Sequence, residues 1–235
     1  MQNANQKTIS KPITFKGVGL HSGVDSQIKI IPAKENFGIK FCRTDLGNNN
    51  LIEANYQNVV EPILCTKIKN KNGTTVSTVE HLMAAFFGEG IDNALVEIDS
   101  PEVPILDGSA SEFVDGIRSV GVKEQKALRK FIKALKKVEI REGDKFIYIE
   151  PLENDLVVDF EIVYKNPLIR TRRQKFKLSN DDLINIYNSR TFCLYEDIDF
   201  IKRQGLAQGG SLDNAIVVRG NEILNDERLE IDMNL

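Results

Sequence analysis

The stretch Ser77-Thr78-Val79-Glu80-His81-Leu82-Met83-Ala84-Ala85-Phe86-Phe87 follows a turn at Gly73. Its length and apolar content predict a buried helix over 77–87. It also holds one of the two histidines, His21 and His81, in this chain of 235 residues. One imidazole cannot hold a metal ion alone, so any chemistry of Glu80 and His81 depends on partners elsewhere.

Glu80 and His81 each allow two interpretations. Ser77 and Glu80 have capping-box spacing, in which the glutamate bonds back to the cap residue. A lone histidine ahead of an apolar run is commonly a half-buried core side chain. In the functional interpretation, one residue ligates a metal while the other reaches a water molecule. Consecutive helix residues point about 100° apart, so both cannot face one ion directly from mid-helix.

The rest of the first half combines strands with a second helix. Short β-rich runs predict strands at 28–31, 37–41 and 94–98. Ser109 has capping-box spacing to Glu112 and therefore predicts a helix start.

The second half has a similar order of elements. It predicts strands at 138–141, 145–150, 156–163 and 215–218, and a helix over 179–188 capped by Ser179 and Asp182. Two β-then-α halves of similar content favour a duplicated α+β fold that divides near 121–129.

Composition excludes several classes of protein. Hydrophobic residues make up 41% of the chain, charged residues make up 28%, and the net charge is -3. These values are ordinary for a globular protein and do not indicate a nucleic-acid binder. The polar N-terminus lacks a signal-peptide core, and no apolar run reaches membrane-spanning length. With three dispersed cysteines, the sequence predicts a cytoplasmic protein with reduced thiols at Cys42, Cys65 and Cys193.

Two further segments remain open at this stage. Residues 123–137 contain seven Lys or Arg and one Glu. This run favours an anionic membrane surface or a phosphate-bearing substrate, although such runs are commonly solvated faces. Gly205-Leu206-Ala207-Gln208-Gly209-Gly210-Ser211 is either a flexible loop or a place where a ligand approaches the backbone.

Four segments taken together resemble one protein family. They are Gly17-Val18-Gly19-Leu20-His21, Ser77-Thr78-Val79-Glu80-His81-Leu82, Pro104-Ile105-Leu106-Asp107-Gly108-Ser109-Ala110, and Arg190-Thr191-Phe192 followed by Gly209-Gly210-Ser211. Their order and content resemble the UDP-3-O-acyl-N-acetylglucosamine deacetylases, and the similarity runs from about Lys7 to Leu235. That family is a zinc amidase family acting at the committed step of lipid A synthesis.

The resemblance implies a fold and an activity. The fold is α+β, with two similar domains, each a β-sheet layered with helices, and with the active site between them. We expect the domains to span 1–127 and 128–235. The implied activity is zinc-dependent hydrolysis of the N-acetyl amide of UDP-3-O-acyl-N-acetylglucosamine, which releases acetate. In this reaction His81 is a zinc ligand, Glu80 is the general base and Thr191 donates to the developing oxyanion.

The resemblance also implies substrate-binding positions. Leu20 and Cys65 are expected on the metal side of the cleft, and Lys145 near the diphosphate. Tyr164 and Asp197 are expected beside the nucleotide. The residues expected to line the fatty-acyl passage are Ile198, Ala207, Ser211 and Val217, whose small or apolar side chains suit a methylene chain. Two positions depart from the family pattern, since Cys193 replaces a common glycine and Ala207 a common cysteine.

The largest departure concerns the zinc ligands. Family members continue past the position of Leu235 into a helix with His-Lys-x-x-x-Asp, which supplies the second and third ligands, and then to a histidine that acts as general acid. We therefore expect an incomplete second domain with an uncovered apolar face, and a chain that alone is a poor or inactive catalyst. The alternative is an inactive remnant that binds only a UDP-sugar or a partner. We further expect a monomer that transiently contacts the inner membrane surface.

Overall fold

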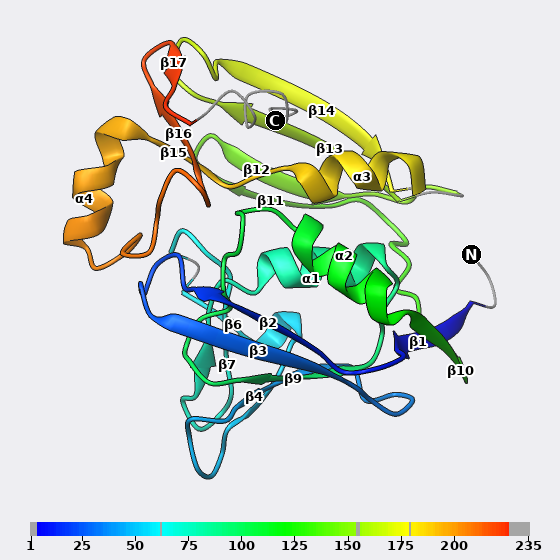
Figure 1. Ribbon diagram of the computed structural model, residues 1–235. Helices are drawn as coiled ribbons and strands as arrows, with labels where there is room; N and C mark the ends of the chain where they lie inside the picture. Colours follow the sequence, from blue (N-terminus) through cyan, green and yellow to red (C-terminus); the bar gives the residue numbers. More distant parts are fainter. Residues whose placement is uncertain (1–3, 62, 154–155, 179, 226–235) are drawn as a thin grey trace.

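The computed structural model describes residues 4–61, 63–153, 156–178 and 180–225. These residues form a mixed α+β structure, in which a lower layer holds the first half of the chain and an upper layer holds most of the second half (Figure 1). The first-half elements are β1 (Asn5–Ile9), β2 (Ile13–Val18), β3 (Asp25–Pro32), β4 (Ile39–Arg43), β5 (Leu51–Glu53), β6 (Val59–Val60), β7 (Lys67–Lys69), β8 (Thr75–Val76), α1 (Glu80–Gly88), β9 (Ala94–Ile98), α2 (Ser111–Val120) and β10 (Val122–Leu128), with a short 3₁₀ turn at Tyr56–Asn58.

A five-stranded sheet in the order β2-β3-β9-β4-β5 forms the base of the lower layer. Strands β4 and β9 run parallel, and the other neighbours in this sheet are antiparallel. Along β9, Ala94, Val96 and Ile98 are buried while Leu95 and Glu97 are partly exposed. This period of two places one face of each strand against the helices. The strands expected at 28–31, 37–41 and 94–98 are confirmed.

Helix α1 lies over this sheet and buries Leu82, Ala85 and Phe86. The helix begins at Glu80, three residues later than expected, and no side chain caps its N-terminus. The predicted capping box between Ser77 and Glu80 is therefore wrong. The helix starts late because Thr78 has a φ of 56°, which interrupts the helical backbone just before Glu80.

Helix α2 begins at Ser111 and also lacks a side-chain cap. The predicted capping box between Ser109 and Glu112 is wrong as well. Ser109 instead donates its hydroxyl to Asp107 Oδ1 at 2.8 Å and accepts the Ser111 amide at 3.0 Å. In this turn the Ser109 hydroxyl bonds the Asp107 carboxylate instead of capping the helix. The helix therefore starts after the turn closes.

The second half contains smaller sheets and two helices. Its elements are β11 (Val138–Glu142), β12 (Lys145–Ile149), β13 (Val157–Val163), β14 (Thr171–Lys177), α3 (Asn180–Asn188), β15 (Phe192–Leu194), a 3₁₀ turn (Tyr195–Asp197), α4 (Ile198–Arg203), β16 (Ile216–Arg219) and β17 (Glu222–Ile223). The predicted strands and the helix are confirmed, while the predicted cap at Ser179 lies outside the described residues. Strands β11 and β12 pair as a hairpin, as do β13 and β14, and β15-β16-β17 form a third sheet.

The cores of the two halves differ in size. The main hydrophobic core holds sheet residues, α1 and α2, together with Leu183 and Tyr187 of α3. The second core has Ile169, Ile216 and Val218 at its centre. Many apolar side chains of the β11–β12 and β13–β14 hairpins are exposed, among them Ile147 at 70% and Phe160 at 58%. No helix among the described residues is long and apolar enough to cross a bilayer.

Helix α3 ties the upper layer to the lower one (Figure 1). Tyr187 is buried against α1, and its hydroxyl donates to Glu89 Oε1 at 3.1 Å. Burial, together with the nearby Glu89 carboxylate, raises the pKa of Tyr187 to about 12. The ring sits directly over Gly88, where an added Cβ would lie 1.9 Å from the Tyr187 hydroxyl. A glycine at this position is therefore what allows α1 and α3 to approach so closely.

Replacing Gly88 with alanine is expected to lower the free energy of unfolding by about 1–3 kcal/mol, because overpacking forces α3 away from α1. Urea unfolding followed by circular dichroism measures the change. Gly47→Ala is the matched control, since a Cβ added there meets nothing within 4 Å. Equal stability of both variants would contradict the close packing of Gly88 against Tyr187.

Candidate active site at the start of α1

The first turn of α1 presents Glu80 and His81 next to each other. Glu80 Oε2 accepts the backbone amide of Thr66 at 3.0 Å, so the carboxylate points towards the loop before β7. His81 is half-buried, and burial lowers its pKa, although the carboxylates of Glu80 and Asp107 act in the opposite direction. The imidazole is therefore neutral at pH 7, which is the form that can ligate a metal ion.

Asp107 connects His81 with the segment that carries Thr191. Its carboxylate lies near enough to His81 to influence the imidazole, and it forms an ion pair with Arg190 at 3.0 Å. The next residue, Gly108, accepts the Thr191 amide at 3.0 Å. The Asp107-Gly108 loop thus bonds the segment of the predicted oxyanion donor and brings a carboxylate near the predicted zinc ligand, although His81 and Thr191 are 110 positions apart in the sequence.

Glu102 is the buried anchor behind this site. It is 1% exposed, and its carboxylate accepts three hydrogen bonds. The donors are the His21 amide at 2.9 Å, the Ser22 amide at 2.7 Å and the Thr78 hydroxyl at 2.7 Å. Thr78 is a β-branched residue with positive φ two positions before Glu80, so this bond holds a strained backbone at the entrance to α1.

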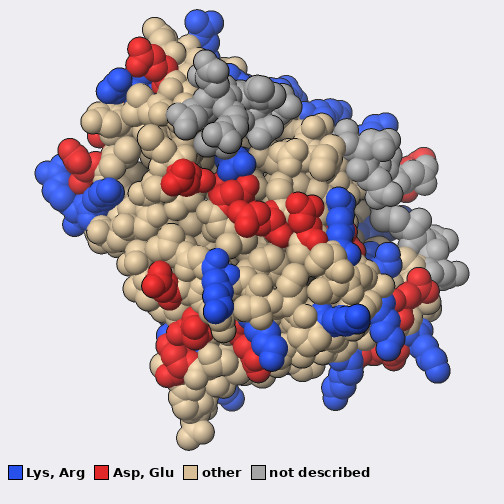
Figure 2. Space-filling view, viewed as in Figure 1, with Lys and Arg blue, Asp and Glu red and all other residues tan. Residues whose placement is uncertain are grey.

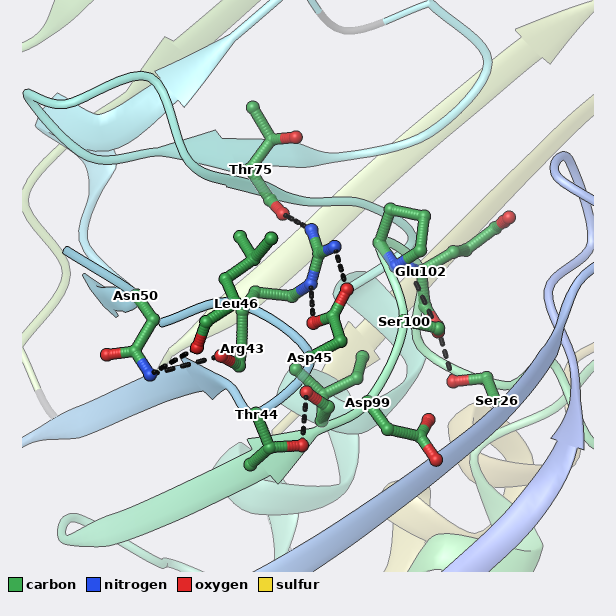
Figure 3. A network of polar contacts seen from close by, with 12 residues as sticks. Ser26, Arg43, Thr44, Asp45, Leu46, Asn50, Thr75, Asp99, Ser100 and Glu102 are labelled. Atoms are coloured by element: carbon green, nitrogen blue, oxygen red, sulfur yellow. Dashed lines mark hydrogen bonds and ion pairs between the residues drawn. The ribbon is translucent and has the colours of Figure 1, made fainter. Parts of the chain in front are cut away.

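The main chain of Glu102 is held as firmly as its side chain. Its carbonyl accepts the hydroxyls of Ser26 at 2.7 Å and Ser100 at 3.0 Å (Figure 3). Burial alone would raise the pKa of Glu102, but the hydrogen bonds from Thr78, His21 and Ser22 outweigh it and hold the pKa below its usual value. Glu102 is therefore ionised, and its role is to fix neighbouring loops.

Figure 3 also shows how β8 is fixed just before Thr78. The guanidinium of Arg43 donates to both carboxylate oxygens of Asp45 at 2.8 and 2.6 Å, and to the Thr75 carbonyl at 2.9 Å. Arg43 is 8% exposed, whereas the Asp45 side chain keeps 32% of its surface exposed, so the guanidinium is buried and the carboxylate reaches solvent. This arrangement holds the strand that leads into the site.

The turn from Gly19 to Gly23 brings Leu20 to the loop that carries Ala207. Gly209 donates its amide to the Leu20 carbonyl at 3.0 Å, and Gln208 donates to the His21 carbonyl at 3.2 Å. An added Cβ at Gly209 would lie 2.3 Å from the Gly19 carbonyl oxygen, so only glycine permits this approach. The 208–209 backbone thus packs against this turn, and both interpretations of 205–211, a flexible loop or the approach of a ligand, stay predictions.

Cys65 lies near the same group of side chains. Burial raises the pKa of its thiol, and the carboxylates of Glu80 and Glu102 raise it further, against hydrogen bonds with Thr78 that lower it. The thiol is therefore protonated at pH 7 and is poorly suited to bind a metal as a thiolate. Its position supports the expectation that Cys65 lies on the Glu80 side of the site.

The other predicted substrate residues lie in the upper layer. Tyr164 packs edge-on against Phe192, next to Thr191, with ring centroids 5.4 Å apart. Asp197 and Ile198 start α4, Ser211 is exposed, and Val217 is 6% exposed opposite Cys193. Lys145 is exposed at the start of β12, and among the described residues no hydrogen bond or ion pair joins it to Glu80, His81 or Thr191.

The metal-ligand set is incomplete in the part of the chain that the structure describes. No group of three His, Cys, Asp or Glu side chains there could hold a metal ion. A neutral His81 with carboxylates nearby fits one position of a zinc site. His21 lies against the loop that carries Ala207, where its Nδ1 accepts the Ala207 amide at 3.4 Å and its buried Nε2 has no hydrogen-bond partner among the described residues. The predicted ligand His81 thus belongs to no complete ligand set within the described residues.

Sequence reasoning missed three residues of this site. Asp107 and Arg190 lie in segments that carry the family resemblance, whereas Glu102 lies in none of them. By itself, the sequence of 100–109 predicts only a loop and a helix start at Ser109. The available signal was an acidic residue between two prolines, Pro101 and Pro104, because a carboxylate in a rigid apolar segment is buried only when donors meet it.

Comparison with known proteins identifies the family of this chain. Residues 6–234 match the family model described as UDP-3-O-acyl N-acetylglycosamine deacetylase. Proteins named UDP-3-O-acyl-N-acetylglucosamine deacetylase from Actinobacillus succinogenes and Pasteurella multocida are each 42% identical to this chain over 227 residues, which is 95% of the chain and 74% of each relative. A relative of the same name from Psychrobacter is 42% identical over 227 residues and is covered to 76%. This chain therefore belongs to the UDP-3-O-acyl N-acetylglycosamine deacetylase family.

Proposed function

We propose that this chain carries the base and one metal ligand of a zinc-dependent amidase that removes the N-acetyl group of UDP-3-O-acyl-N-acetylglucosamine in lipid A biosynthesis. The observation that supports this most strongly is the Asp107-Gly108 loop, which connects the neutral His81 beside Glu80 with Thr191. The names of the relatives indicate the substrate, and the residues of the site indicate the type of reaction.

The residues of this chain divide the work of hydrolysis. Glu80 is the general base that takes a proton from the attacking water. Thr191 donates its hydroxyl to the oxyanion that develops on the amide carbonyl, and the products are a free amine and acetate. His81 holds its neutral imidazole ready as a ligand. A zinc ion, when bound, polarises the amide carbonyl and makes a water molecule more acidic.

The substrate would extend from this site into the upper layer. We propose that Lys145 binds the diphosphate and that Tyr164 and Asp197 contact the nucleotide. The acyl chain passes Ile198, Ala207, Ser211 and Val217, while Leu20 and Cys65 lie on the metal side of the cleft. The contact of Leu20 with the 207–210 loop supports an acyl passage that adjoins the metal side. The same proposal divides the chain into domains 1–127 and 128–235, with the active site between them in the cytoplasm.

A polypeptide of residues 1–235 alone is expected to deacetylate this substrate poorly, because its described residues offer one zinc ligand. The test compares it with a chimaera in which the C-terminal quarter of the Pasteurella multocida relative follows this chain. Mass spectrometry of the deacetylated UDP-sugar measures turnover with added zinc. Turnover by the chimaera alone supports the proposal. An inactive chimaera that folds and binds the UDP-sugar favours a binding remnant, and family-like turnover by 1–235 would contradict the one-ligand site.

Replacing His81 with alanine in the chimaera is expected to weaken zinc binding at least about tenfold, because one zinc ligand is removed. Folding should be retained, because His81 is only half-buried and is not part of the hydrophobic core. Competition with a chromogenic chelator measures zinc affinity, and circular dichroism checks folding. His21→Ala is the matched control, and it should leave zinc affinity unchanged. Unchanged zinc affinity in His81→Ala would show that the ligand assignment is wrong.

A further inference from the structure

The segment that joins β10 to β11, residues 129–137, exposes large apolar side chains. Ile132 is 98% exposed, Leu135 is 86% exposed and Phe131 is 51% exposed. The segment is neither helix nor strand, and it connects the lower layer to the upper one (Figure 1). Side chains this exposed contribute almost nothing to the stability of the fold. The described residues therefore leave this apolar surface free for another partner.

The same segment carries positive charge that the fold does not neutralise. Arg129 pairs with Asp92 at 2.8 Å, and Lys137 pairs with Glu139 at 3.1 Å. Lys130, Lys133 and Lys136 have no ion-pair partner within the residues that the structure describes. Figure 2 shows Lys and Arg gathered around the end of the molecule where β1 and β10 lie, with some acidic side chains among them.

The order of residues would separate the apolar and basic side chains on a helix. Leu128, Phe131, Ile132 and Leu135 follow the spacing i, i+3, i+4, i+7, which forms one apolar stripe. The lysines fall between them and would take the other side. A helix this short is unstable in water, which agrees with the irregular backbone observed here. A surface that binds the apolar stripe would favour the helix.

The apolar surface continues beyond this segment. On the β11–β12 hairpin, Val138, Ile140, Ile147 and Ile149 share one face and are between 50% and 70% exposed. The opposite face carries Glu139, Arg141, Phe146 and Tyr148, so it mixes charged and aromatic side chains. The hairpin thus places a second exposed apolar face directly after 129–137 in the chain.

We propose that residues 128–138 dock on the surface of a bilayer that contains anionic lipids. The apolar side chains enter the boundary between headgroups and acyl chains, while Lys130, Lys133 and Lys136 meet the lipid phosphates. A soluble phosphate compound would engage the lysines and leave the apolar residues in water. A second copy of this chain would bring its own unpaired lysines against these three, which is repulsive.

The chain contains no tryptophan, so one introduced tryptophan reports on a single place. Phe131→Trp places it in the segment, and Tyr56→Trp, at a position that is 82% exposed in the first half, is the matched control. Phosphatidylcholine vesicles containing phosphatidylglycerol are expected to blue-shift the emission of Phe131→Trp alone. The shift should weaken with added salt, because the lipid charge is screened.

Charge and apolar variants separate the two contributions, with vesicle co-sedimentation as the measurement. Lys130→Glu/Lys133→Glu/Lys136→Glu should weaken binding by about a hundredfold or more, since each lysine near an anionic surface contributes roughly fivefold. Lys16→Glu/Lys29→Glu/Lys69→Glu makes the same change in net charge at exposed positions elsewhere and should weaken binding far less. Ile132→Ser/Leu135→Ser keeps the charge and should also weaken binding.

Circular dichroism should gain helical signal with phosphatidylglycerol vesicles and not with phosphatidylcholine alone. The proposal is overturned if both vesicle types bind equally, or if the two lysine triples behave alike. A blue shift with inorganic phosphate alone would assign the lysines to a soluble anion. Displacement of the protein from vesicles by low concentrations of RNA would assign them to nucleic acid. Either result would show that the membrane surface is not the partner of this segment.

Discussion

Replacing Glu80 with glutamine in the active chimaera is expected to lower kcat by about 10²–10⁴-fold, because glutamine cannot accept the proton of the attacking water. The side chain keeps its size and its oxygen, which can still accept the Thr66 amide, so the start of α1 should not move. The KM for the UDP-sugar and the affinity for zinc are expected to change little, since the lost interaction is made in the transition state. Steady-state kinetics and chelator competition measure the three quantities.

The control for this prediction is Glu150→Gln, which removes the same charge from an exposed position after β12. It should retain the kcat of the unaltered chimaera. A Glu80→Gln chimaera that keeps most of its kcat would show that Glu80 serves only the Thr66 amide. Glu80 would then be a structural residue and not the general base.

Replacing Glu102 with alanine is expected to lower the free energy of unfolding by about 3–6 kcal/mol, which is a large share of the stability of an ordinary domain. The change leaves the amides of His21 and Ser22 and the hydroxyl of Thr78 without their acceptor. Each buried donor without a partner costs about 1–3 kcal/mol. Thr78 also loses the bond that holds its positive φ, so the start of α1 should loosen.

Urea unfolding followed by circular dichroism measures this loss in the chain of 235 residues, without any need for activity. Glu53→Ala is the control, because Glu53 forms an exposed ion pair with Lys40 and its loss should cost less than about 1 kcal/mol. Similar stabilities of Glu102→Ala and Glu53→Ala would refute the anchoring role of Glu102.

The stabilising effect of Glu102 should depend on pH in a defined direction. Its pKa in the folded protein lies below the usual value of 4.5, because its hydrogen bonds outweigh burial. A carboxyl group with a lowered pKa stabilises the fold fully above its unfolded pKa, and that contribution is lost as the pH falls further. The unaltered chain should therefore lose stability below about pH 4.5, and Glu102→Gln should show a shallower loss over the same range. Urea midpoints at several pH values measure both slopes.

Most helices and strands, and the family, could be predicted from the amino-acid sequence. Short runs rich in β-forming residues predicted the strands at 94–98 and 156–163. The length and apolar content of the run around His81 predicted α1. Four short segments in the correct order identified the family that the comparisons confirm. The division into two domains and the substrate positions stay predictions.

The start of α1 depends on contacts between residues that are far apart in the sequence. Local spacing predicted a capping box at Ser77 and Glu80, but a cap is one of several partners that a glutamate can find. Thr78 takes a positive φ because its hydroxyl bonds Glu102, which lies 24 positions further along the chain. That bond delays the helix to Glu80 and frees the carboxylate to meet Thr66. A capping pattern involves residues that are close in sequence. Glu102 instead accepts hydrogen bonds from residues that are distant in sequence and that meet it only in the folded chain.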